Sequence, residues 1–93
     1  MNKYYVYILT NRTHNVLYIG VTNNIGRRIF EHKEGVIEGF TKKYKVHKLV
    51  YVEEYIDIKD AILREKRLKH WMKEWKINLI SKANPQWKEV TCV

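Results

Sequence analysis

The stretch YYVYILTNRTHNVLYIGVT, residues 4–22, contains two runs rich in aromatic and β-branched side chains, separated by polar residues. Residues 4–9 and 16–21 are each typical of a β-strand, and the polar residues between them are typical of a turn. We therefore expect an antiparallel hairpin, which brings side chains that are distant in the sequence next to each other. Tyr7 and Tyr18, one from each run, are candidates for such neighbours.

Downstream of the hairpin, the pattern changes to helices around one further strand. N-cap residue types precede a helical pattern that ends near residue 33, and Asp57 precedes another that continues towards residue 70. Residues 71–81 are also helical in pattern, either continuous with the preceding helix or separated from it by a bend. We expect a loop after residue 35 and a third strand at 48–55. The order β-β-α-β-α-α predicts an α+β fold, a small three-stranded, mainly antiparallel sheet flanked by helices.

Length and charge limit the possible functions. A chain of 93 residues predicts a single domain, with its core at about 3–87 and a tail at 88–93 for which no structure is predicted. The 18 Lys and Arg against 10 Asp and Glu give a net charge of +8, which favours an acidic partner, and nucleic acid is the first candidate. The alternative is a domain with a charged surface and no such partner.

Cysteine and histidine usage predicts a cytoplasmic protein without structural zinc. Cys92 is the only cysteine, so an internal disulfide is impossible, as in a reducing cytosol. The four histidines are scattered without metal-finger spacing. We find no secretory segment after Met1 and no apolar run long enough to span a bilayer, so no membrane association is expected.

The first predicted helix carries polar residues on its apolar face. At helical spacing the face reads Ile25, Arg28, Ile29 and His32, whereas Arg27 points away. A buried guanidinium needs a carboxylate, a phenol network or a bound anion, unless it extends along the helix edge to water. His32 is either hydrogen-bonded within the fold or catalytic.

The second predicted helix places a carboxylate where leucine is expected. Its apolar stripe contains Ile58, Ala61, Ile62, Glu65, Leu68 and Met72, and its cationic neighbours Arg64, Lys66 and Arg67 should point to other sides. An inward Glu65 can form a salt bridge, for example with Arg28, or bind a hard cation such as Mg²⁺. Convergence of Tyr7, Tyr18, Arg28 and Glu65 on one cavity would favour a functional site.

Aromatic and basic residues elsewhere are less specific. Trp71, Trp75 and Leu79 recur at helical spacing, which is typical of core packing, although an exposed ring can also stack on a base. Lysines are either solvated or contact a phosphate backbone, and we expect one cluster to do the latter. The candidates for nucleic-acid binding are Arg27, Lys42, Lys43, Lys45, Lys66, Lys69 and Lys73.

These residues together resemble the GIY-YIG endonuclease superfamily. Tyr5-Val6-Tyr7 lies where the first half of the family motif falls, with Tyr5 in place of its first glycine, and Tyr18-Ile19-Gly20 is an intact second half. Arg28 matches the family's essential arginine, His32 a frequent histidine and Glu65 the metal-binding glutamate. Residues 40–44 and 84–87 are similar to the small stand-alone members. The resemblance covers about residues 3–87.

The resemblance implies a metal-dependent endonuclease that hydrolyses phosphodiester bonds in DNA. In this interpretation Glu65 binds Mg²⁺ or Mn²⁺, and Arg28 binds the phosphate. Tyr18 acts as general base with Tyr7 beside it, and His32 relays a proton or supports Tyr7. Gly20 and Asn84 are supporting residues, Asn84 orienting Glu65 or the backbone.

The same resemblance suggests what kind of cleavage to expect. The domain is similar to the N-terminal catalytic domain of the excision-repair nuclease subunit, so DNA repair is an expected setting, although further domains choose the target there. One site cuts one strand, so a monomer should nick, and the expected lack of a targeting domain favours structure-guided over sequence-specific cutting. The alternative is a non-catalytic nucleic-acid-binding module that uses the same basic surface.

Overall fold

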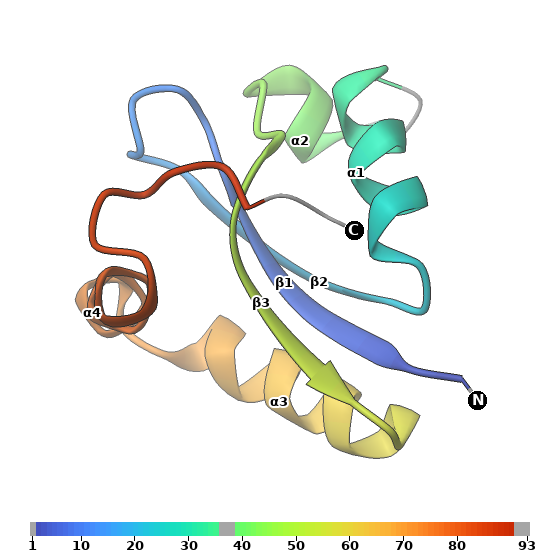
Figure 1. Ribbon diagram of the computed structural model, residues 1–93. Coiled ribbons are helices and arrows are strands. Elements are labelled where there is room, and N and C mark those ends of the chain that lie inside the picture. The colour runs from blue at the N-terminus through green and yellow to red at the C-terminus, as the bar shows by residue number, and fades with distance from the viewer. Residues whose placement is uncertain (1, 36–38, 91–93) are drawn as a thin grey trace.

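A three-stranded antiparallel sheet forms the centre of the molecule (Figure 1). The computed structural model describes residues 2–35 and 39–90. β1 (Tyr4–Thr10) is the middle strand, with β2 (Leu17–Thr22) on one side and β3 (Lys48–Tyr55) on the other. The predicted hairpin and third strand are therefore confirmed. Because β1 is covered on both faces, its last five residues are all buried, and its sequence does not alternate.

Helices cover both faces of the sheet (Figure 1). α1 (Ile25–Lys33) and α2 (Phe40–Lys43) lie on one side, and α3 (Ile58–His70) and α4 (Lys73–Ala83) lie on the other. Each side has its own apolar cluster. The predicted α+β order is confirmed, with the addition of α2, a single turn within the segment expected to be a loop. None of the helices in the described part of the chain is both long enough and apolar enough to cross a membrane.

Side-chain caps start α1 and α3 where the sequence predicts. The Asn24 carboxamide oxygen accepts a hydrogen bond from the Arg27 amide at 3.0 Å, and the Asp57 carboxylate accepts one from the Lys59 amide at 2.8 Å. The sequence left open whether the last two helices are continuous. They are separated, because Trp71 and Met72 both have extended backbone, with ψ of 150° and 148°.

The buried face of α3 differs from the predicted stripe. Ala61 and Leu68 are fully buried as expected, but Ile62 is 38% exposed. Arg64, expected to point away, instead reaches β3, where its Nε and Nη2 each donate to the Glu53 carboxylate at 2.9 Å. The helix is rotated because this carboxylate on the facing strand offers the guanidinium a paired, half-buried position.

Candidate active site

Tyr7 lies at the centre of the site, on the face of β1 that α1 covers. Its side chain is 1% exposed, and its strand partner in β2 is Gly20. A Cβ atom at position 20 would lie 2.4 Å from the Tyr7 hydroxyl oxygen and 2.5 Å from Cζ, distances too short for any real contact. Gly20 therefore provides the space that the Tyr7 phenol occupies.

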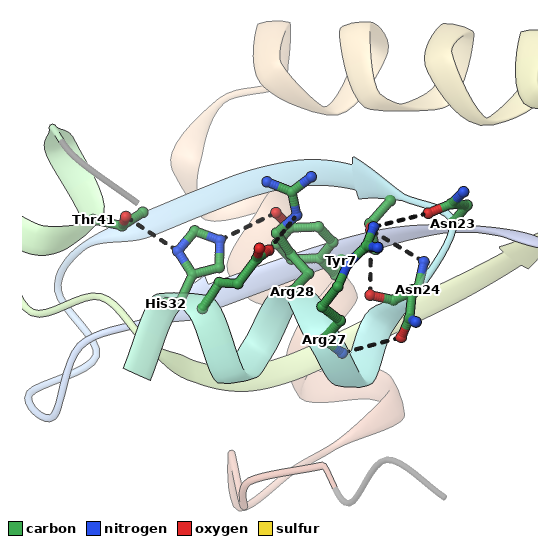
Figure 2. A network of polar contacts seen from close by, with 9 residues as sticks. Tyr7, Asn23, Asn24, Arg27, Arg28, His32 and Thr41 are labelled. Atoms are coloured by element: carbon green, nitrogen blue, oxygen red, sulfur yellow. Dashed lines mark hydrogen bonds and ion pairs between the residues drawn. The ribbon is translucent and has the colours of Figure 1, made fainter. Parts of the chain in front are cut away.

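A chain of polar contacts leads from Tyr7 to α2 (Figure 2). The Tyr7 hydroxyl lies 3.3 Å from Nε2 of His32 on α1, and Nδ1 of His32 lies 3.1 Å from the Thr41 hydroxyl. A neutral imidazole has one donor and one acceptor nitrogen. One consistent arrangement has Tyr7 donating to Nε2 while Nδ1–H donates to Thr41. His32 thus connects the sheet to α2.

Tyr18 completes an aromatic cluster around His32. It pairs with Leu9 across the β1–β2 ladder, so its side chain lies on the same face as Tyr7 and Leu9. The Tyr18 ring centroid is 5.6 Å from that of His32 and 6.3 Å from that of Tyr7. Tyr18 is half-buried on an edge strand, whereas Tyr7 is buried on the central strand.

Arg28 extends from α1 across this cluster in Figure 2. Its Nε atom is buried and has no hydrogen-bond acceptor among the described residues. The Glu31 carboxylate lies 3.9 Å away, close enough for charge attraction but too far for a hydrogen bond. The arginine therefore retains donor capacity that an anion such as phosphate can satisfy.

Burial and charge determine which of these groups hold protons. Burial, followed by the neighbouring Tyr18 and the carboxylates of Glu65 and Glu31, raises the pKa of Tyr7 well above its ordinary value, against the opposing effect of Arg28. Burial, then the Arg28 charge, lowers the pKa of His32. At neutral pH Tyr7 is therefore a protonated phenol and His32 a neutral imidazole.

Glu65 approaches the cluster from α3, on the other side of the sheet. Its carboxylate is one-fifth exposed and pairs with Lys69 at 3.3 Å, one turn along the same helix. Its charge adds to the raised pKa of Tyr7. The structure groups Tyr7, Tyr18, Arg28 and His32 on the α1 side of the sheet, whereas Glu65 lies on α3.

The residues fit a divalent cation bound largely by water and substrate. Within residues 2–35 and 39–90 no three His, Cys, Asp or Glu side chains are grouped to form a metal site. Mg²⁺ is often held by one or two carboxylates together with waters and substrate phosphates. The single, largely buried carboxylate of Glu65 suits that mode.

Other predicted residues lie outside the cluster. The Asn84 carboxamide donates to the backbone oxygens of Val50 at 3.1 Å and Lys88 at 2.8 Å, so it organises backbone. The predicted nucleic-acid contacts are all exposed: Arg27, Lys42, Lys43, Lys45, Lys66, Lys69 and Lys73. Trp75 is also 51% exposed, at the edge of Trp71, so the tryptophan stripe is only partly core.

Two residues of the site were not singled out from the sequence. Thr41 lies in a one-turn helix, too short for periodicity to indicate which side chain is buried. Glu31 lies one turn from Arg28, and their i, i+3 spacing could have indicated that the two side chains are neighbours.

Comparison with known proteins identifies the family. The family model described as the GIY-YIG catalytic domain matches residues 3–78, a range that contains Tyr7, Tyr18, Arg28, His32 and Glu65. The chain belongs to the GIY-YIG family. Membership implies nuclease activity in general and a nucleic-acid substrate.

Relatives of similar length match most of this GIY-YIG chain. It is 33% identical to a UPF0213 protein of Staphylococcus saprophyticus over 89% of this chain and 100% of the relative. It is 37% identical to a UPF0213 protein of Syntrophus aciditrophicus, over 92% and 98% of the two chains. The solution NMR structure of a UPF0213 protein from Bacillus halodurans is similar with a TM-score of 0.60 and 27% identity, covering 96% of this chain and 94% of that one.

Proposed function

We propose that this GIY-YIG protein is a metal-dependent endonuclease that hydrolyses phosphodiester bonds in DNA, one strand at a time. The observation that supports it most is the cluster of two phenols, an imidazole and an arginine whose buried Nε lacks an acceptor. A scissile phosphate bound to Arg28 would supply that acceptor. The guanidinium would then also stabilise the additional negative charge of the transition state.

Tyr18 is the proposed general base. Because Tyr7 is buried and its pKa is raised, Tyr7 retains its proton and serves to hold His32. Tyr18, half-buried on the edge strand, would act as the phenolate, accepting a proton from the attacking water molecule and becoming a neutral phenol. The water oxygen bonds to phosphorus, the bond from phosphorus to the 3′ oxygen breaks, and that oxygen takes a proton from solvent.

Glu65 would hold the cation, Mg²⁺ or Mn²⁺. When bound, such a cation polarises the phosphate and stabilises the departing oxygen. Glu65 itself would bring a full negative charge to a phosphate site, where in the absence of a cation it would repel the substrate. This repulsion favours the nuclease over a module that only binds nucleic acid.

Cleavage of labelled duplex, single-stranded and branched DNA with Mg²⁺ or Mn²⁺ tests the proposal. We expect metal-dependent nicking that Tyr18→Phe and Glu65→Gln each reduce by at least about 100-fold, the usual contribution of an acid–base group. Glu65→Gln should bind DNA as well as or better than the wild type. Tyr4→Phe, on the opposite face, and the exposed Glu74→Gln serve as matched controls that should cut normally.

The outcomes separate the two functions. Binding without cutting on every substrate and with either metal would favour the non-catalytic module. Cutting that survives both substitutions would place the catalytic centre elsewhere.

A further inference from the structure

The segment that follows α4 crosses the edge of the sheet and is held there by specific contacts. The Asn84 side chain bonds the β3 backbone at Val50, and the Val90 amide donates to the Leu49 oxygen at 2.8 Å. Between them, Trp87 is buried in the cluster on the α3 and α4 side, with Nε1 donating to the Ser81 hydroxyl at 2.9 Å. Figure 1 shows this segment passing along β3 towards the α1 side.

This path places Glu89 in a basic hollow. The carboxylate pairs with Lys33 at the end of α1. The hollow has a volume of about 460 Å³, and its described lining is Arg12, Lys33, Lys45, His47, Lys48 and Glu89. Four cationic side chains, from three stretches of the chain, therefore line the hollow together with one carboxylate. Their mutual repulsion is only partly offset by Glu89, so the hollow retains a positive potential.

Unusual backbone conformations surround the hollow. Every non-glycine residue with positive φ in the described part of the chain is nearby in structure: His14 (61°), Lys45 (55°) and Trp87 (53°). The His14 and Trp87 rings stack with centroids 5.1 Å apart, and the Lys48 ammonium lies 3.1 Å from Nε2 of His14. Such conformations tend to cluster at functional sites.

The hollow adjoins the candidate active site. Lys33 follows His32 directly on α1, and the charge of His47 contributes to lowering the pKa of His32. Arg28 and Lys33 are five positions apart on α1, a rise of about 7.5 Å along the helix axis.

We propose that the hollow binds a backbone phosphate of the nucleic acid near the scissile one, and that Glu89 occupies the hollow until that phosphate displaces it. The segment thereby carries an internal competitor of the substrate. This inference rests on the proposed function for its ligand, but it concerns binding alone and is measured without cleavage.

Fluorescence anisotropy with a labelled DNA duplex, in EDTA and over a range of salt, tests the inference. Glu89→Gln should bind more tightly, by up to about fivefold at low salt, because it removes one exposed ion pair that competes with the phosphate. Lys45→Ala/Lys48→Ala should reduce the slope of log affinity against log salt by about 0.9, the contribution of the one phosphate contact that the hollow would make.

Matched controls remove the same charges elsewhere. Glu74→Gln and Lys59→Ala/Lys82→Ala alter exposed residues of α3 and α4 outside the hollow, and neither should have these effects. Thermal unfolding of every variant identifies any that has lost its fold. Two results together would instead assign the hollow to a small phosphorylated ligand. Inorganic phosphate would raise the Tm of Glu89→Gln more than chloride does at equal ionic strength, and the salt slope of DNA binding would be unchanged in Lys45→Ala/Lys48→Ala.

The results also distinguish this inference from the proposed function. The inference alone would be overturned if the protein cuts DNA normally but Glu89→Gln binds DNA no more tightly than the wild type. The same holds if Lys45→Ala/Lys48→Ala has the same salt slope as its control. If the hollow variants change DNA binding as expected but no DNA is cut under any condition, the proposed nuclease activity would be overturned and the inference would stand. No binding by any variant would overturn both.

Discussion

Replacing Gly20 by alanine should destabilise the protein even though the backbone there can accept a side chain. Gly20 has no positive φ, so the lower conformational entropy of unfolded alanine would by itself stabilise the fold by about 0.4–1 kcal/mol. The added Cβ would, however, lie 2.4 Å from the Tyr7 hydroxyl and 2.5 Å from Cζ. Tyr7 is fully buried and bonded to His32, so its ring cannot move aside freely.

Overpacking of this kind costs about 1–3 kcal/mol, and each kcal/mol lowers Tm by about 4–8 °C in a domain of this size. Differential scanning calorimetry and urea titration measure the change. Gly26→Ala is the matched control, because a Cβ there meets nothing closer than the Asn24 side-chain oxygen at 3.9 Å. Because Gly26 lies in an exposed part of α1, Gly26→Ala should stabilise the protein by about 0.5–1 kcal/mol.

A second variant tests whether Tyr7 is the source of the cost. Tyr7→Phe removes the hydroxyl but leaves Cζ, so it should relieve only part of the strain in the Gly20→Ala background. The two substitutions should therefore cost less together than the sum of their separate effects. A Gly20→Ala protein as stable as the wild type, or strictly additive effects, would refute the role of Gly20 as the space for this phenol.

Three further changes test the electrostatics and the packing. Since burial and Arg28 lower the pKa of His32, stability should fall as pH drops from about 6.5, the ordinary histidine pKa, through the lower folded value. Urea titrations should show a weaker pH dependence for His32→Gln, and equal slopes would contradict this. Asn84→Ala loses two donated hydrogen bonds and one accepted, so urea titration should show a loss of about 2 kcal/mol. Burial alone would raise the pKa of Glu53, but hydrogen bonds, chiefly from Arg64, lower it. Glu53→Gln should therefore lower the free energy of unfolding by about 2 kcal/mol at pH 7. Urea titrations should show this loss vanish as pH falls from about 4.3, the ordinary glutamate pKa, through the lower folded pKa.

Local rules were sufficient where a feature depends on neighbours in the sequence. Asn24 and Asp57 cap their helices as expected, because a cap needs only a residue and the next two or three amides. Helical spacing also identified the face that carries Ile29 and His32, both buried, with Arg28 half-buried between them. Both features follow from the geometry of one turn.

Features that depend on a distant partner could not be predicted this way. Spacing alone turns Ile62 of α3 inward, yet Arg64 packs on the sheet because Glu53 lies on the facing strand. Likewise, the contact between Gly20 and Tyr7 depends on the register of the hairpin, because a shift by one residue would place a residue with a side chain opposite Tyr7.

The position of each strand in the sheet also separates two tyrosines that the sequence makes equivalent. Tyr7 belongs to the central strand, covered on both faces, and this burial is the largest cause of its raised pKa. Tyr18 belongs to the edge strand and keeps part of its surface accessible. A general base must reach water, whereas a residue that positions an imidazole must keep its proton. The strand order β2-β1-β3 therefore supports a division of roles in which Tyr18 accepts the proton and Tyr7 orients His32. That division predicts that Tyr18→Phe lowers kcat more than Tyr7→Phe does, and that Tyr7→Phe also lowers the free energy of unfolding.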